Sequence, residues 1–285
     1  SIILGTALGG LLISSAVAGH LLSIDIPFID TGVDTPAEAA MVIIVAVYAI
    51  AATFNLYIPL TGVDHRMPKT NPIFLVHDFY HCMRLLWQDK LGQISLAVTT
   101  LFWGAGATLQ FIVIEWSKSA FGFGLSKASM LQGVVAIGVA LGAVLAAKLI
   151  SLRQSVKVIP LGIAMGVVVI LMTFVDDPLI AMPLLVLIGI LSGFFVVPMN
   201  ALLQHRGHVL MGAGHSIAVQ NFNENLSILI MTGFYSVMIM ANFSINIIIV
   251  LFGLFVAGLM LMIKRHHEMN QRQLDSVALL DEATH

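Results

Sequence analysis

The chain has 285 residues, of which 59% are hydrophobic and 10% are charged, and its mean hydropathy is +0.99. Soluble domains carry about 25% charged residues, so this composition excludes a soluble globule. The 13 Lys and Arg residues and the formal net charge of −2 leave no basic surface for a nucleic acid, and the single cysteine, Cys82, excludes a disulfide framework and a cysteine-cluster metal site.

Eight apolar runs are long enough to cross a bilayer as helices, which takes about 20 residues. Runs such as MVIIVAVYAIAATFNLYIPL are apolar on every side, whereas the strands of a membrane barrel alternate in polarity over about ten residues. The sequence therefore predicts an all-α, polytopic transmembrane helix bundle. In chain order, the predicted spans are residues 1–22, 38–60, 93–117, 128–150, 156–175, 180–203, 211–240 and 243–263.

The longest connection, residues 61–92, separates the first two spans from the other six. In a transporter built from two six-helix halves, we expect such a connection between the halves. Eight of twelve spans are then present, and four more are expected before Ser1. The predicted divisions are 1–60 (the last two spans of an N-terminal half), 61–92 (the connection), 93–264 (the C-terminal half) and 265–285 (a tail).

Positive charge is distributed unequally between the two sides of the predicted bundle. Of the 13 Lys and Arg residues, 11 flank one set of span ends, and only Lys118 and Lys127 flank the other. Positively charged flanks stay in the cytoplasm. The 61–92 connection and the C-terminus are therefore predicted to be cytoplasmic.

The connection contains the segment PIFLVHDFYHCMRLLWQDK, in which His77 and His81 are four residues apart and lie beside Asp78 and Cys82. This spacing suits a metal site. However, the apolar and polar residues of the segment also separate onto two faces, as expected of a helix lying in the membrane interface. We favour the interfacial helix and predict no metal ligands and no cofactor.

The span at residues 211–240 carries an unusually polar segment. An ionisable group at membrane depth costs a few kcal/mol and usually faces the bundle interior. Glu224 lies roughly 20 Å along the helix from Met211, near the midplane, where transporters hold their substrates. The segment therefore predicts a polar binding site, although side chains that only join helices by hydrogen bonds are the alternative. Its polar residues are Gln220, Asn221, Asn223, Glu224 and Asn225.

Two polar side chains in other spans are candidates for the same site. Gln110 lies in the span at residues 93–117. Asn200 follows Pro198, where the proline removes a backbone donor and weakens the helix. Asn200 marks either a hinge or a static kink in which it caps a freed carbonyl.

Small residues let membrane helices approach closely. Three glycine pairs with four-residue spacing therefore predict tight helix crossings. These pairs are Gly138–Gly142, Gly162–Gly166 and Gly189–Gly193.

Four segments, LFWGAGATLQF, VAIGVALGAVLAAKLISL, GFFVVPMNALLQHRG and GAGHSIAVQNFNEN, occur in this order along the chain. They resemble the lysophospholipid transporter family of the major facilitator superfamily. The resemblance implies twelve spans and movement of lysophosphatidylethanolamine and lysophosphatidylglycerol from the outer to the inner leaflet of the bacterial inner membrane. It also implies a partner acyltransferase/acyl-carrier-protein synthetase that re-acylates them. Where the family has a gate arginine, this chain has Gln110, so no Arg–carboxylate gate is expected.

The preferred function is lipid transport, with the headgroup held by Glu224 and the neighbouring amides and with no catalytic residue. A drug–proton or small-solute antiporter, in which Glu224 cycles its protonation, is the alternative. An intramembrane enzyme is disfavoured because the predicted spans contain no HExxH or GxSxG motif and no carboxylate pair. A membrane scaffold that transports nothing would tolerate the loss of Glu224.

Overall fold

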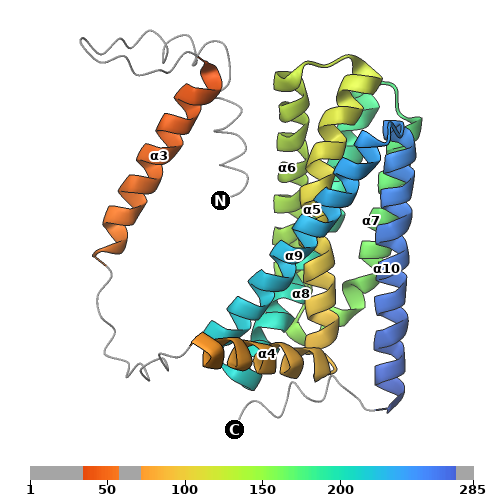
Figure 1. The fold of residues 1–285 in the computed structure, drawn as a ribbon. Coiled ribbons are helices and arrows are strands. Elements are labelled where there is room, and N and C mark those ends of the chain that lie inside the picture. The colour runs from red at the N-terminus through yellow and green to blue at the C-terminus, as the bar shows by residue number, and fades with distance from the viewer. Residues whose placement is uncertain (1–34, 58–71, 274–285) are drawn as a thin grey trace, which may run out of the picture. The chain divides into compact units, whose positions relative to one another are not determined.

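The computed structural model describes residues 35–57 and 72–273 of the chain. Every regular element in this part is a helix and none is a strand, which confirms the predicted all-α class (Figure 1). The chain divides into two compact units, Ser1–Thr70 and Asn71–His285. The predicted span at residues 1–22 lies outside the described residues.

The described part of the first unit is the helix α3, Pro36–Asn55. A capping box closes its N-terminus. Thr35 Oγ1 accepts a hydrogen bond from the Glu38 backbone N–H at 3.3 Å, and Glu38 Oε2 accepts one from the Thr35 backbone N–H at 2.8 Å. Pro36 lies in the first turn, where its missing N–H needs no partner. The predicted span at residues 38–60 is therefore helical as far as Asn55.

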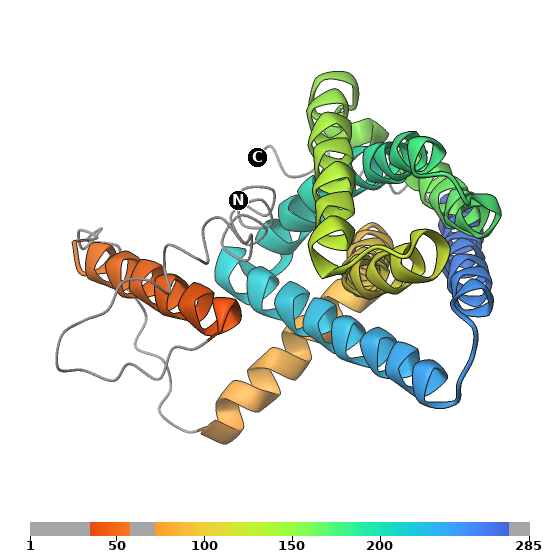
Figure 2. The same cartoon turned by 90° about the horizontal axis from the view of Figure 1, so that it is seen from above.

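The second unit contains the other described helices. The helices α5 to α10 run along a bundle, and α4 lies across one end of it (Figure 1, Figure 2). Five apolar segments of the described chain are long enough to cross a membrane, and each matches a predicted span. The helix α9 is not among them, because its polar segment lowers its hydropathy. The elements are α4 (Pro72–Gln88), α5 (Gly92–Phe121), α6 (Leu125–Leu149), η1 (Leu152–Val158), α7 (Ile159–Ile170), η2 (Leu171–Phe174), α8 (Pro178–Met211), α9 (Ala213–Met240) and α10 (Ile245–Gln273).

A buried ion pair fixes the turn between α4 and α5. Arg206 of α8 donates from Nε to Asp89 Oδ2 at 3.0 Å and from Nη2 to Asp89 Oδ1 at 2.5 Å. The two side chains are only 7% and 9% exposed. Asp89 Oδ2 also accepts a hydrogen bond from the backbone N–H of Gly92, the first residue of α5, at 2.7 Å. One carboxylate thus joins the start of α5 to the end of α8.

The helices α8 and α10 continue eight or more residues beyond the ends predicted for their spans. The helix α8 is unbroken to Met211 although Pro183 and Pro198 lie inside it. The helix α10 continues past residue 263 to Gln273, and Lys264 and Glu268 form an ion pair one turn apart on the added part, at 3.7 Å. Residues 265–273 of the predicted tail are therefore helical. The predicted span ends mark where the hydropathy of the sequence falls. The helices themselves continue past these points.

A close helix crossing joins α6 to α8 through four glycines. A Cβ atom added at any of the four would lie under 3.0 Å from a backbone carbonyl oxygen of the opposite helix. A second close crossing joins Gly166 of α7 to Gly253 of α10. All three predicted glycine pairs therefore lie at tight contacts, which confirms the packing prediction. The four glycines of the α6–α8 crossing are Gly138, Gly142, Gly189 and Gly193.

Candidate functional site

Three of the predicted polar residues meet between α8 and α9. Gln220 and Glu224 lie one turn apart on α9 and are 7% and 8% exposed. The Gln220 side-chain amide donates one hydrogen bond to Glu224 Oε1 at 2.7 Å and another to Asn200 Oδ1 of α8 at 2.8 Å. The amide nitrogen has two hydrogens, so one group serves both acceptors. Gln220, Glu224 and Asn200 are called the polar cluster below.

A tryptophan from a third helix completes the surroundings of Glu224. The Trp103 side chain of α5 lies near the carboxylate. Next to Trp103, Gly104 lies against Ser227 and Met231 of α9, which brings α5 close to the cluster. Sequence reasoning did not select Trp103, although it lies within the segment LFWGAGATLQF.

The other amides of α9 bond within their own helix. Asn223 is half-buried and donates to the Val219 carbonyl at 2.8 Å. Asn225 donates to the carbonyl of Asn221 at 2.7 Å, and both of these asparagines are exposed. The α9 segment thus has a buried polar side and an exposed polar side.

Gln110 lies apart from the polar cluster. Its side chain is exposed, and its backbone carbonyl accepts a hydrogen bond from Gln132 of α6 at 2.8 Å. The ring of the next residue, Phe111, stacks on Tyr235 with 6.0 Å between centroids. Tyr235 lies about three turns beyond Glu224 along α9. Gln110 therefore lies at a different position along the length of the bundle from Glu224.

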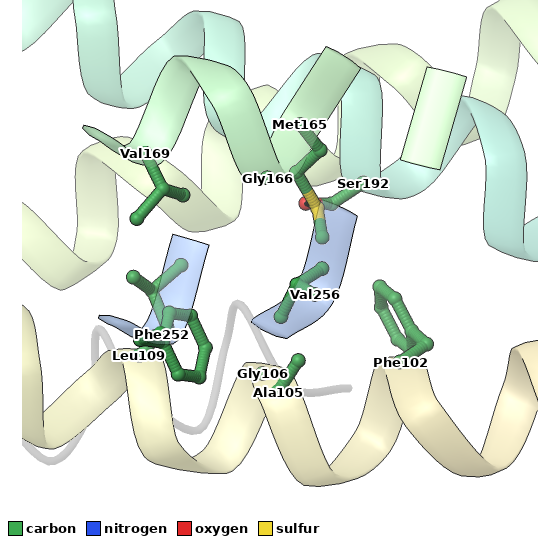
Figure 3. Close-up of a pocket in the computed structure, with 10 residues that line it drawn as sticks. All are labelled: Phe102, Ala105, Gly106, Leu109, Met165, Gly166, Val169, Ser192, Phe252 and Val256. Atoms are coloured by element: carbon green, nitrogen blue, oxygen red, sulfur yellow. Dashed lines mark hydrogen bonds between the residues drawn. The ribbon is translucent and has the colours of Figure 1, made fainter. Parts of the chain in front are cut away.

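A small apolar cavity lies between α5, α7, α8 and α10 (Figure 3). Its volume is about 20 Å³, and a single water needs about 10–15 Å³. Its polar side chain, Ser192, already donates to the Ile188 carbonyl at 2.7 Å. The cavity is therefore too small and too apolar for a lipid headgroup.

Known proteins are similar to this chain in sequence. Two curated proteins named lysophospholipid transporter LplT, from Yersinia pestis (strain Pestoides F) and Yersinia pseudotuberculosis serotype O:3 (strain YPIII), are each 42% identical to this chain. Each match extends over 202 residues, which is 70% of this chain and 50% of the relative. This chain is related to the lysophospholipid transporters.

The relationship confirms the resemblance read from the four segments. The chain spans about half the length of the lysophospholipid transporters that it matches. These relatives are named as transporters and not as enzymes. No protein-family model matches the chain.

One solved structure is also similar to the chain. It is an inward-facing, unoccupied bacterial homologue of the human lysosomal transporter Spinster, with a TM-score of 0.49 and 16% identity. The match covers 99% of this chain and 66% of that protein.

Proposed function

We propose that this chain belongs to a transporter of the major facilitator superfamily that moves lysophospholipids across a membrane. The observation that carries the proposal is the polar cluster, a carboxylate and two amides from two helices of an apolar bundle. Burying such groups costs free energy unless they are paired, and the pairing here leaves acceptor oxygens on Glu224 for a ligand. The 42% identity to curated lysophospholipid transporters supports the same substrate class.

In the proposed mechanism, the lipid headgroup enters the polar cluster while the acyl chain stays along apolar helix surfaces. Glu224 accepts hydrogen bonds from the ammonium of lysophosphatidylethanolamine, and the Gln220 amide exchanges its hydrogen bond to Asn200 for one to the phosphate. Gln110, Asn221, Asn223 and Asn225 contact the headgroup at other stages of its passage. Asn200, beside Pro198, couples the cluster to movement of α8.

The proposal extends to the setting in which the transporter acts. We place it in the bacterial inner membrane, with the C-terminus in the cytoplasm, because 11 of the 13 Lys and Arg residues flank one set of span ends. Transport runs from the outer to the inner leaflet. A partner acyltransferase/acyl-carrier-protein synthetase then re-acylates the lipid. Residues 1–60 and 93–264 contribute to the two halves of the transporter.

Glu224→Gln is expected to slow lysophosphatidylethanolamine transport in vesicles by about 10- to 100-fold. Hydrogen bonds to a charged group contribute about 1.5–3 kcal/mol, and each 1.4 kcal/mol corresponds to about tenfold. The matched control is Glu115→Gln on α5, which makes the same chemical change on a carboxylate that is 45% exposed. The control is expected to keep the wild-type rate. If the Glu224→Gln variant transports at the wild-type rate, Glu224 takes no part in the mechanism.

A small-solute or drug–proton antiporter is the second candidate, because a buried carboxylate such as Glu224 is suited to cycling between protonation states. The two functions respond differently to the proton gradient. Collapse of the gradient with an ionophore abolishes transport by an antiporter. Lipid movement down its own gradient is expected to continue.

A further inference from the structure

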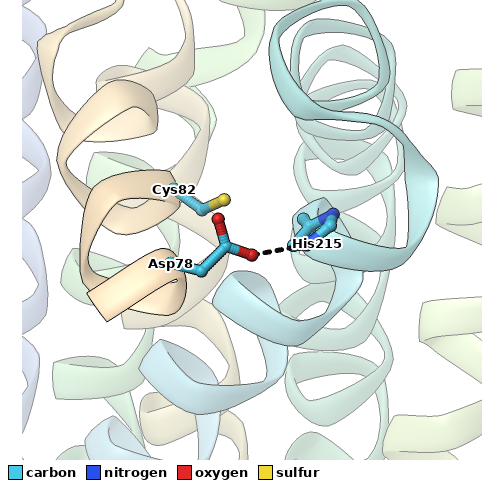
Figure 4. A group of neighbouring side chains, drawn as sticks. All are labelled: Asp78, Cys82 and His215. Carbon is cyan, nitrogen blue, oxygen red and sulfur yellow. Dashed lines mark hydrogen bonds and ion pairs between the residues drawn. The ribbon is translucent and has the colours of Figure 1, made fainter. Parts of the chain in front are cut away.

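Three side chains with metal-binding atoms converge at the end of the bundle where α4 lies (Figure 4). Asp78 and Cys82 are one turn apart on α4, and His215 lies in the first turn of α9. The carboxylate oxygen, the thiol sulfur and the imidazole nitrogen all lie within 4.8 Å of one another. Asp78 Oδ2 is 3.0 Å from His215 Nε2.

Packing of α4 on the bundle holds the three side chains together. Cys82 is buried in an apolar cluster with Leu86, Leu96, Leu203 and Val219. The ring of Phe79 meets that of Phe222 of α9 edge to face, with 5.3 Å between centroids. The thiol is therefore fixed by apolar contacts. Asp78 and His215 are 56% and 55% exposed, which leaves one side open to water and to an entering ion.

We propose that Asp78, Cys82 and His215 form a zinc site with water as the fourth ligand. Zinc prefers thiolate, imidazole and carboxylate ligands in tetrahedral geometry. Bond lengths of about 2.0–2.3 Å place the ligand atoms of a tetrahedral zinc roughly 3.3–3.8 Å apart. Side-chain rotations that move these atoms by about 1 Å therefore close the site. The thiolate disfavours calcium and magnesium, which take oxygen ligands.

The charges of the three ligands match a divalent cation. A thiolate and a carboxylate supply two negative charges, and neutral histidine supplies none, so the occupied site is neutral. Burial and the neighbouring Asp78 raise the pKa of the Cys82 thiol above its ordinary value. Because zinc binds cysteine as a thiolate, binding forms a zinc–sulfur bond and releases the thiol proton to water. The occupied site joins α4 to the helix that carries the polar cluster.

The sequence alone points to a different set of residues. His77 and His81 have the spacing of a helical metal site, but both are exposed, and neither lies in the converging group. His215 is 137 residues beyond Asp78 in the chain, so only the packing of α4 on α9 reveals it.

The test is titration of the purified chain, carrying a tag without histidine, with Zn²⁺ by calorimetry and with Co²⁺ by absorption spectroscopy. The wild type is expected to bind one ion and to give a thiolate-to-cobalt charge-transfer band. Cys82→Ala is expected to lose the band, and His215→Ala to weaken binding by at least about tenfold. The matched control is His81→Ala, which removes an exposed histidine next to Cys82 and is expected to bind like wild type.

Two results would overturn the proposal. One is a wild-type Co²⁺ spectrum without a sulfur band, which would leave Asp78 and His215 as a hydrogen-bonded pair only. The other is equal Zn²⁺ affinity in the wild type and in the Cys82→Ala/His215→Ala double variant. Circular dichroism of each variant without metal shows whether the helices remain folded, so a loss of binding is not mistaken for unfolding.

Discussion

Arg206→Ala is expected to lower the free energy of unfolding by about 3–5 kcal/mol, because it leaves the Asp89 carboxylate buried without its cation. Arg206 binds Asp89 through two nitrogens, and their side chains are only 7% and 9% exposed. Asp89 also holds the first backbone N–H of α5. The variant therefore weakens the junction between α4, α5 and α8. Denaturant titration in detergent micelles, followed by circular dichroism, measures the change.

An exposed ion pair of the same chain is the matched control. Lys118 and Glu115 lie 3.2 Å apart on α5 and are 46% and 45% exposed. Lys118→Ala is expected to change the free energy of unfolding by about 0–1 kcal/mol, because water replaces the lost partner. An Asp89→Leu/Arg206→Met double variant is expected to recover stability relative to Arg206→Ala, since no buried charge is left unpaired. Equal stability of Arg206→Ala and Lys118→Ala would show that the buried pair does not hold the junction.

The described helices could be predicted from the sequence because the signal is local. A run such as residues 128–150 is apolar for longer than any buried soluble strand, so its length and composition define α6 without knowledge of its neighbours. The predicted ends of the helices were less accurate. The helix α8 continues beyond residue 203, and Arg206 in this added part is buried against Asp89, which is 117 residues away in the chain.

The candidate site was predictable in part for the same reason. Gln220 and Glu224 are one turn apart on a single helix, so their common face follows from helix geometry. Trp103 reaches Glu224 from α5, and a tryptophan in an apolar span carries no local sign of a polar partner. His215 likewise joins Asp78 only through the packing of α4 on α9. Contacts between distant helices were therefore the part that the sequence did not predict.

Gly142→Ala is expected to lower the free energy of unfolding by about 1–3 kcal/mol, the usual cost of forcing extra atoms into a packed interface. A Cβ atom at Gly142 of α6 would overlap the backbone carbonyl oxygen of Ile190 on α8. A flexible side chain could rotate away, but a backbone carbonyl moves only if the whole helix moves. The two helices must therefore separate along the crossing. Thermal unfolding of the purified chain in detergent micelles is expected to begin at a lower temperature.

Gly133→Ala on the same helix separates this packing effect from helix propensity. A Cβ atom at Gly133 meets no atom within 4 Å. Alanine is a better helix former than glycine by about 1 kcal/mol, so this variant is expected to be as stable as wild type or slightly more stable. A glycine-to-alanine substitution is thus expected to lower the free energy of unfolding at Gly142, where a backbone lies opposite, and to leave it unchanged or raise it at Gly133, where none does. If both variants shifted stability equally, the α6–α8 contact would not be the tight crossing that its glycines indicate.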